Sequence, residues 1–247
     1  MCRHLAYLGP PITLASLLFE PAHSLAHQSW APADMRGGGT INADGFGVGW
    51  FAAGGPVRYR RATPLWSDTT LPGLAAVTAS GAILAAVRSA TVGMPVTEQA
   101  AAPFAEGPWL FSHNGKVTGW PGSVAKPAGA LPPVDLLTLD APTDAALLWA
   151  LVRDRLRHGA GPREAVAGTI AEVAAAAPGS RLNLLLTDGE TVVASTYGHS
   201  LSVRKRAGSV IVSSEPLDDD PSWQPVGDRT LVVATAAELH QIPLGEV

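Results

Sequence analysis

The order of local patterns along this 247-residue chain limits its fold more than any other feature of the sequence. Two helix patterns lie in the middle, at residues 145–157 and 162–177, and short apolar runs typical of strands lie on both sides of them. Pro162 suits the first turn of the second helix, and Pro178-Gly179 ends it. A doubly wound parallel sheet would instead alternate helices with single strands. The sequence therefore predicts an α+β fold, a layered sandwich of sheets and helices.

Strand and loop signals fill the rest of the chain. Strands are predicted at residues 3–8, 46–52, 56–61, 82–88, 109–112, 182–187, 191–197, 201–204, 210–213 and 231–234. Two short helices are predicted at 14–19 and 23–30. The segment 122–142 is rich in Pro, Gly and Ala, so we expect a surface loop there, either a plain insertion or a lid. Neither a repeat nor a linker divides the chain, and one domain over residues 2–247 is expected.

The composition bounds the class of protein. Hydrophobic residues make up 47% of the chain and charged residues 15%, which is typical of a globular protein with a substantial core. The net charge of −4 gives no electrostatic reason to expect a nucleic-acid partner. No apolar run approaches the roughly 20 residues that cross a bilayer, and the start of the chain lacks the apolar region of a signal peptide. We expect a cytoplasmic protein that binds a small molecule and has no membrane partner; the sequence does not predict the oligomeric state.

Metal and cofactor chemistry find little support. The single cysteine excludes an internal disulfide and a multi-thiolate metal site. His23 and His27 share a helix face, yet no third ligand lies nearby in the sequence. The glycines of Gly45–Gly49 enter a strand and do not open a helix, unlike those of a dinucleotide-binding loop. We therefore expect no metal and no cofactor.

The position of that cysteine suggests a nucleophile. Removal of Met1 would make Cys2 the first residue and leave it with a free α-amine, whose ordinary pKa is about 7.7–8.0. Nucleophile and base would then share one residue, and a cysteine thiol needs little activation. The alternative is an incidental small hydrophobic residue.

A second motif offers hydrogen-bond donors. His113-Asn114-Gly115 follows an apolar strand and places an amide side chain next to a glycine N–H. A tetrahedral oxyanion requires donors of these kinds, each of which can lower the barrier by about 3–4 kcal/mol. The alternative is an ordinary Asn-Gly turn.

Two charged residues have similarly divided interpretations. Arg88 ends a predicted core strand, where it can hold a carboxylate with two hydrogen bonds or simply be an exposed strand-end charge. Asp144 lies at the start of the first central helix, where it can bind a substrate ammonium or cap the helix.

Taken together, these motifs resemble those of the class II, or N-terminal-nucleophile, glutamine amidotransferases. The matching segments, in order, are Cys2, Asn42–Gly47, Arg88–Thr91, His113–Gly115 and Thr143-Asp144. The match spans roughly residues 2–235, and five motifs in register are far more specific than any one of them. The resemblance implies a four-layer α/β/β/α sandwich of antiparallel sheets.

The resemblance also implies roles. Cys2 would be the nucleophile, and Asn114 with the Gly115 N–H would form the oxyanion hole. Arg88 would bind the α-carboxylate of a glutamyl group, and Asp144 its α-ammonium with help from the Ser89 carbonyl. The predicted substrate-binding residues are Arg88, Ser89, Thr91, His113 and Asp144. Attack on the γ-carbonyl would give a thioester that water resolves.

Two further segments indicate the leaving group. Asn42–Trp50 and Ser213–Pro221 resemble those of stand-alone amidohydrolases in ergothioneine biosynthesis, which remove glutamate from γ-glutamyl-hercynylcysteine sulfoxide. Sugar-amidating relatives carry Asn-Ala-His-Pro where this chain has Ala100–Pro103. A hercynyl group has a trimethylammonium, which aromatic faces would suit. The candidate aromatic residues are Trp30, Trp66, Trp120 and Trp223.

Two alternatives stay open. The chain could be a glutaminase subunit that delivers ammonia to a separate synthase. It could also be a catalytically silent binding module of the same fold, in which case Met1 would stay attached.

Overall fold

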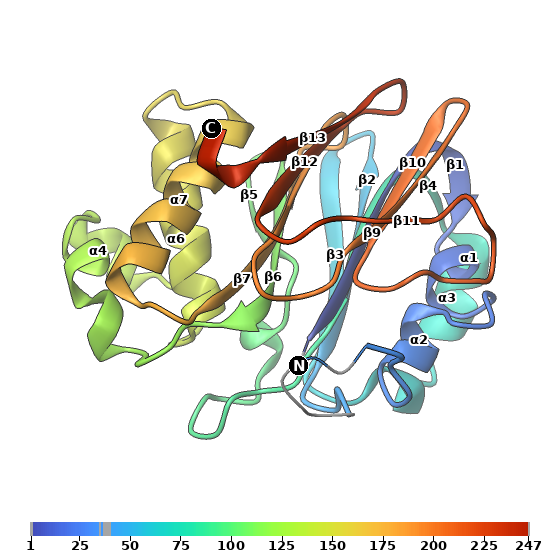
Figure 1. Cartoon of the computed structure of the whole chain (residues 1–247). Coiled ribbons are helices and arrows are strands. Elements are labelled where there is room, and N and C mark those ends of the chain that lie inside the picture. Colours follow the sequence, from blue (N-terminus) through green and yellow to red (C-terminus); the bar gives the residue numbers. More distant parts are fainter. Residues whose placement is uncertain (1, 35, 37–40, 247) are drawn as a thin grey trace.

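A computed structural model describes residues 2–34, 36 and 41–246 (Figure 1). Met1, whose removal would make Cys2 the first residue, lies outside these residues. Two antiparallel sheets face each other, and helices cover the outer face of each sheet, which makes four layers (Figure 1). This confirms the predicted α+β sandwich.

The first sheet has seven strands and carries the start of the chain. Their order is β11 (Gln224–Pro225), β9 (Ser202–Arg206), β10 (Ser209–Ser213), β1 (Arg3–Thr13), β4 (Ala79–Val87), β2 (Phe46–Ala52) and β3 (Gly55–Arg61). Helices α1 (Ala15–Leu18), α2 (Leu25–Gln28) and α3 (Leu71–Val77) cover its outer face. Because β1 lies in the middle of this sheet, Cys2, the residue that precedes it, lies at the end of a central strand.

The second sheet has six strands and carries the two long helices. Their order is β13 (Leu239–Pro243), β12 (Thr230–Ala234), β8 (Val192–Thr196), β7 (Arg181–Thr187), β6 (Trp109–Lys116) and β5 (Phe104–Glu106). The covering helices are α4 (Ala125–Gly129), α5 (Pro133–Leu137), α6 (Asp144–Arg157) and α7 (Pro162–Ala176). The described residues also form four short 3₁₀ helices: η1 (Leu65–Ser67), η2 (Glu98–Ala100), η3 (Gly122–Val124) and η4 (Leu244–Glu246).

Alternation of side chains along the strands creates three hydrophobic layers. On β1, Leu5 packs toward the α1–α3 helices, whereas Ala6 packs between the sheets. On β6, Leu110 lies between the sheets, and Phe111 stacks on Trp149 of α6 with ring centroids 5.4 Å apart. The same alternation decides which way the polar end of β6 points, which matters for the site.

The structure differs from the sequence-based predictions in its short elements. The segment 122–142, expected to be a loop, contains η3, α4 and α5, and its Val124 and Leu131 are buried against the helix layer. Prolines and glycines suggested irregular structure, but prolines also fit the first turn of a helix, as in α5. Strand β1 continues past the prolines to Thr13, with a shift of register between Leu8 and Ile12. Helix α3 and strands β5, β11 and β13 were not predicted.

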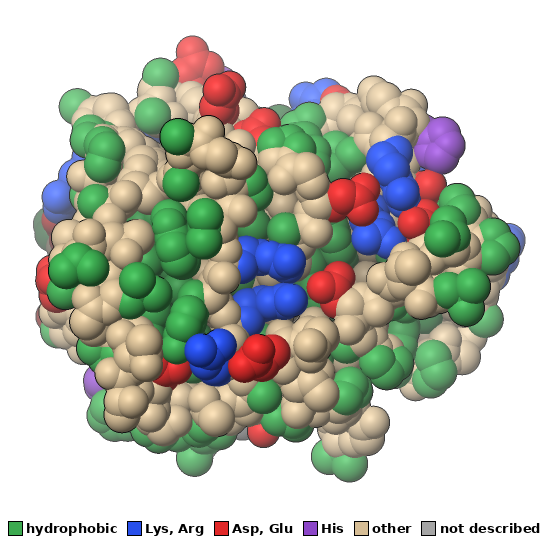
Figure 2. All heavy atoms as spheres, turned by 180° about the vertical axis from the view of Figure 1, so that it is seen from behind, with side chains coloured by type: hydrophobic (Ala, Val, Ile, Leu, Met, Phe, Trp, Pro, Cys, Tyr) green, Lys and Arg blue, Asp and Glu red, His purple; other side chains and the backbone are tan. Residues whose placement is uncertain are grey.

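Charges of both signs meet on the surface. On the face turned away in Figure 1, Lys and Arg side chains line a hollow near the middle and lie beside acidic side chains (Figure 2). Within residues 2–34, 36 and 41–246, no helix is long and apolar enough to cross a membrane.

Candidate active site

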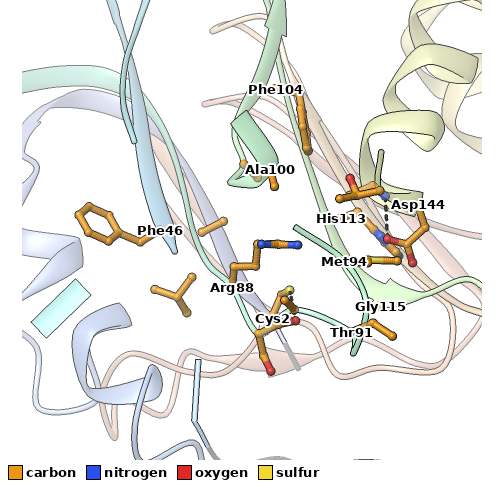
Figure 3. A pocket seen from close by; sticks show the side chains of 17 residues that line it. Cys2, Phe46, Arg88, Thr91, Met94, Ala100, Phe104, His113, Gly115 and Asp144 are labelled. Atoms are coloured by element: carbon orange, nitrogen blue, oxygen red, sulfur yellow. Dashed lines mark hydrogen bonds between the residues drawn. The ribbon is translucent and has the colours of Figure 1, made fainter. Parts of the chain in front are cut away.

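A pocket opens where the ends of β1 and β4 approach the end of β6 and the start of α6 (Figure 3). Its lining residues are Cys2, Phe46, Ala86, Val87, Arg88, Ser89, Ala90, Thr91, Met94, Ala100, Ala102, Phe104, His113, Gly115, Thr143, Asp144 and Ala145. All the predicted site residues except Asn114 are among them. Segments that are far apart in sequence therefore meet in one pocket, as the roles implied by the family resemblance require.

Sheet register places Cys2 in this pocket. Arg3 pairs with Val87 in the β1–β4 ladder, so Cys2, one residue earlier, lies opposite the end of β4. Cys2 is partly buried, and its Sγ lies 3.9 Å from the backbone oxygen of Ser89. The thiol thus faces the Arg88–Thr91 segment.

Arg88 is a buried cation that keeps free donors. Its side chain is 9% exposed and points into the pocket close to Cys2 (Figure 3). One nitrogen, Nη1, donates to the backbone oxygens of Pro95 at 2.9 Å and Asp44 at 3.4 Å. Among the described residues, no acidic side chain forms a salt bridge with it. A buried guanidinium without a protein counter-ion is suited to an anionic ligand.

Asp144 is the matching buried anion on the other side of the pocket (Figure 3). It is 6% exposed, and its two oxygens accept hydrogen bonds from the backbone N–H groups of Val117 at 3.0 Å and Ala145 at 2.8 Å. No basic side chain in the described part of the chain forms a salt bridge with it. The N-cap of α6 is Thr143, whose Oγ1 accepts from the N–H of Ala146 at 3.2 Å, so Asp144 is not the N-cap, although its Oδ1 accepts the first-turn N–H of Ala145.

The polar end of β6 presents its side chains in two directions. Strand β6 continues to Lys116, and Asn114 pairs with Asn183 of β7, so the Asn-Gly turn alternative is also wrong. His113 and Gly115 line the pocket. Asn114 points between the sheets, is 1% exposed and donates from Nδ2 to Ser214 Oγ at 3.3 Å.

Close packing explains the glycine and fixes the histidine. A Cβ on Gly115 would lie 1.9 Å from the backbone oxygen of Arg181, so any side chain would push β6 away from β7. His113 Nε2 lies 3.0 Å from that same oxygen. Because a carbonyl only accepts, Nε2 of His113 carries a proton and donates it to this oxygen.

A buried histidine lies behind the site and was not predicted. His4 is fully buried between the sheets, and its Nδ1 lies 3.2 Å from Ser112 Oγ. Burial first, and then the nearby His113, His199 and Arg3, lower the pKa of His4 to about 3. The imidazole is therefore neutral at neutral pH. Alternation along the strand predicted at 3–8 would have placed His4 on the same face as Ala6, which was the signal available.

The Asn42–Gly47 motif supports the pocket from outside. Asp44 Oδ2 accepts from the N–H of Ala90 at 2.8 Å, and the Asp44 N–H donates to the Arg88 oxygen at 3.0 Å. A Cβ on Gly47 would lie 2.3 Å from the Ala102 oxygen. Apart from Phe46, which lines the pocket, the motif shapes the turn that carries Arg88.

A second hollow continues from the pocket, because Thr91 and Met94 line both. Lys116 and Trp120 line this second hollow, which makes Trp120 the candidate tryptophan that adjoins the site. Trp223 instead lies beneath Arg204, with the guanidinium 4.7 Å from the indole centre.

His23 and His27 belong to a hydrogen-bonded cluster. Their Nδ1 atoms are 3.0 Å apart, and His23 Nε2 lies 2.6 Å from Glu215 Oε2. Among the residues that the structure describes, no group of three or more His, Cys, Asp or Glu side chains is arranged to hold a metal ion.

Comparison with known proteins identifies the class. The family model of the class II glutamine amidotransferases matches residues 14–208. The chain therefore belongs to the class II glutamine amidotransferase family, as the motifs predicted.

Individual relatives are more specific. The chain is 43% identical over 235 residues to the γ-glutamyl-hercynylcysteine sulfoxide hydrolase of Mycobacterium tuberculosis (strain CDC 1551 / Oshkosh), covering 95% of this chain and 93% of that protein. It is 41% identical over 245 residues to the protein of the same name from Mycolicibacterium smegmatis, covering 99% and 100%. Among solved structures, a glutamine aminotransferase class-II domain protein from Silicibacter pomeroyi matches with a TM-score of 0.71 and 27% identity, covering 98% of this chain and 99% of that one.

Proposed function

We propose that this protein is an amidohydrolase that cleaves γ-glutamyl-hercynylcysteine sulfoxide into glutamate and hercynylcysteine sulfoxide. The two hydrolases that are 41–43% identical to it over nearly their full length support this substrate. The main supporting observation is a pair of buried opposite charges, Arg88 and Asp144, which share one pocket with the thiol of Cys2. Neither forms a salt bridge with any residue that the structure describes. A glutamyl end has a carboxylate and an ammonium, one for each of these charges.

In the proposed mechanism, the α-amine of processed Cys2 removes the thiol proton and Sγ attacks the γ-carbonyl carbon. The carbonyl oxygen becomes an oxyanion, which the Gly115 N–H and Asn114 Nδ2 would stabilise. Asn114 lies behind the pocket wall and its Nδ2 donates to Ser214, so this role requires the second N–H of the amide to turn toward the bound substrate. Collapse of the intermediate breaks the C–N bond, and the amine's proton passes to the leaving nitrogen. Water then hydrolyses the glutamyl thioester and restores the thiol.

The leaving group would extend into the hollow past Thr91 and Met94. The Trp120 indole there suits the trimethylammonium, at about 0.5–2 kcal/mol, and Lys116 suits a carboxylate. We expect Trp120→Ala to raise KM for the hercynyl substrate by several-fold and to leave glutamine turnover unchanged. Trp66→Ala is the matched control, because Trp66 is 45% exposed and lines neither hollow. Equal effects of both variants would show that the leaving group does not bind in this hollow.

A substrate panel tests the proposal as a whole. Glutamine, γ-glutamyl dipeptides and the hercynylcysteine sulfoxide conjugate are supplied separately, and glutamate release is measured for each. We expect the conjugate to have the highest kcat/KM. A preference for free glutamine would favour the glutaminase subunit, and no release from any substrate, with Met1 retained by intact mass, would favour the silent module. The single domain over residues 2–247 and the cytoplasmic location are also part of this proposal; cell fractionation checks the second.

A further inference from the structure

A buried ion pair lies directly behind the cysteine and outside its pocket. Arg3 and Glu215 are each 2% exposed, and Arg3 Nε lies 2.7 Å from Glu215 Oε1. Neither residue lines the candidate active site. Fully buried charges are costly for a fold, so their retention beside the site calls for an explanation.

Arg3 holds the backbone of Cys2. Cys2 precedes β1, and the first ladder pair of that strand is Arg3 with Val87. The Cys2 carbonyl instead accepts a hydrogen bond from Arg3 Nη1 at 3.0 Å. Nη2 of the same guanidinium donates to the backbone oxygen of Asp34. After Met1 is removed, Cys2 is joined to the chain on one side only, so this contact limits how far its backbone can shift.

Glu215 in turn fixes the guanidinium. It bonds the Arg3 Nε, His23 Nε2 at 2.6 Å, and the backbone N–H groups of Ala33 at 2.8 Å and Asp34 at 3.2 Å. A carboxylate has about four acceptor sites, and here each has a partner. Burial alone would raise the pKa of Glu215, but His23, the Ala33 N–H and Arg3 outweigh it and lower the pKa below its ordinary value. The carboxylate is thus ionised, and all of its acceptor positions are used by other groups of the protein.

We propose that Arg3 and Glu215 are positioning residues that set the place of the Cys2 nucleophile through its carbonyl group. The inference rests on the proposed function, because it assumes that Cys2 attacks the γ-glutamyl carbonyl. Small displacements of a reacting group are costly: a shift of about 1 Å can reduce the rate about 10²-fold. The effect belongs in kcat, because neither residue touches the pocket where substrate binds.

The test replaces the whole pair with apolar side chains. An Arg3→Met/Glu215→Met double variant removes both charges, and such replacements often leave stability unchanged. We expect a folded protein with a Tm near that of the wild type, a kcat about 10²-fold lower and a KM nearly unchanged for the same γ-glutamyl substrate. Intact mass is measured first, and kcat is expressed per chain that has lost Met1.

A matched control separates positioning from structure. Arg153 and Asp135 form another buried pair, 3.2 Å apart with side chains 10% and 5% exposed, in the helix layer. Arg153→Met/Asp135→Met should keep the wild-type kcat. A folded Arg3→Met/Glu215→Met protein with wild-type kcat would overturn the inference, as would an equal loss in the control.

Arg3→Lys covers the case in which the double variant does not fold. Lysine keeps the charge but replaces a planar guanidinium, whose Nε, Nη1 and Nη2 each bond a different partner, with one compact ammonium, so we expect a lower kcat with unchanged KM. A wild-type kcat in this variant would overturn the inference. Failure of the proposed function has a different signature, because then wild-type protein that lacks Met1 would release no glutamate from any γ-glutamyl substrate.

Discussion

Replacement of Asp144 tests recognition of the glutamyl ammonium group. Asp144→Ala removes a carboxylate that is 6% exposed and unpaired with any basic side chain in the described ranges. If it binds the substrate ammonium, the variant leaves that charge desolvated without a counter-ion. Breaking one side of a buried ion pair costs about 3–5 kcal/mol. Since about 1.4 kcal/mol is tenfold, kcat/KM should fall by at least about 10²-fold.

The same substitution also removes structural hydrogen bonds, so the assay must separate the two effects. Asp144 accepts the N–H of Val117 at the end of β6 and the N–H of Ala145 at the start of α6. Losing them lowers stability and slows turnover of every substrate alike. N-acetylation of the glutamyl amine removes the substrate's charge and leaves the enzyme intact. The measurement is therefore kcat/KM for wild type and Asp144→Ala, each with free and N-acetylated substrate, together with Tm.

The expected result is strong coupling. Wild-type enzyme should lose at least about 10²-fold with the acetylated substrate, and Asp144→Ala should lose little more when the acetyl group is added. Arg88→Lys serves as a companion variant. The lysine ammonium is a point charge that cannot make the paired hydrogen bonds of a guanidinium, so we expect a low kcat/KM in this variant too. Strict additivity of mutation and acetylation would refute the reasoning and leave Asp144 only its two backbone contacts.

Three further predictions test other parts of the site. Cys2→Ala should abolish turnover and preserve the fold, since this is the only cysteine of the chain; near-wild-type glutamate release would end the proposed mechanism. Asn114→Ala should lower kcat roughly 10²–10³-fold with a smaller change in KM, whereas an effect confined to KM would remove Asn114 from the oxyanion hole. His4→Gln should weaken the pH dependence of stability. With a pKa of about 3 when folded and about 6.5 when unfolded, His4 binds its proton only in the unfolded chain between these values, so stability falls as pH drops below 6.5. His4 should account for about 2 kcal/mol of the loss between pH 7.5 and 5 in urea denaturation, and an unchanged loss in the variant would contradict this.

The long elements could be predicted from the sequence, and the short ones could not. Helices α6 and α7 carry several turns of buried residues, so their period is visible locally. Strand β11 has two residues, both exposed, and β13 lies at a sheet edge with a mostly exposed face. Such strands form because a neighbouring strand offers backbone hydrogen bonds. Their own residues show no pattern from which that neighbour could be predicted.

The site divides in the same way. Arg88, Cys2 and His113 could be assigned to one place because the family's motifs lie at strand ends, and the structure does bring these residues to one pocket. The direction of Asn114 depends on the extent of β6, which continues four residues beyond the predicted end at Ser112. The Arg3–Glu215 pair joins residues 212 positions apart, and no local pattern connects them. The pair could therefore be recognised only in the folded structure.

Buried charges in this protein differ in how many of their hydrogen-bonding positions are occupied by other protein groups. This difference distinguishes charges that stabilise the fold from charges that are available to a ligand. Glu215 has all its acceptor positions occupied by protein groups, so it has nothing left for a ligand. Within the part of the chain that the structure describes, Arg88 donates only through Nη1, one of its three side-chain nitrogens, and Asp144 uses about two of its four acceptor positions. The remaining donors of Arg88 are enough for two hydrogen bonds to a carboxylate, and the remaining acceptor positions of Asp144 are enough to bind an ammonium. Two buried charges with unused capacity cost folding free energy in the empty protein, and a bound zwitterion would offset that cost for both at once. Glutamate or a glutamyl analogue should therefore raise Tm in wild type, and each single variant, Arg88→Ala or Asp144→Ala, should lose most of that increase.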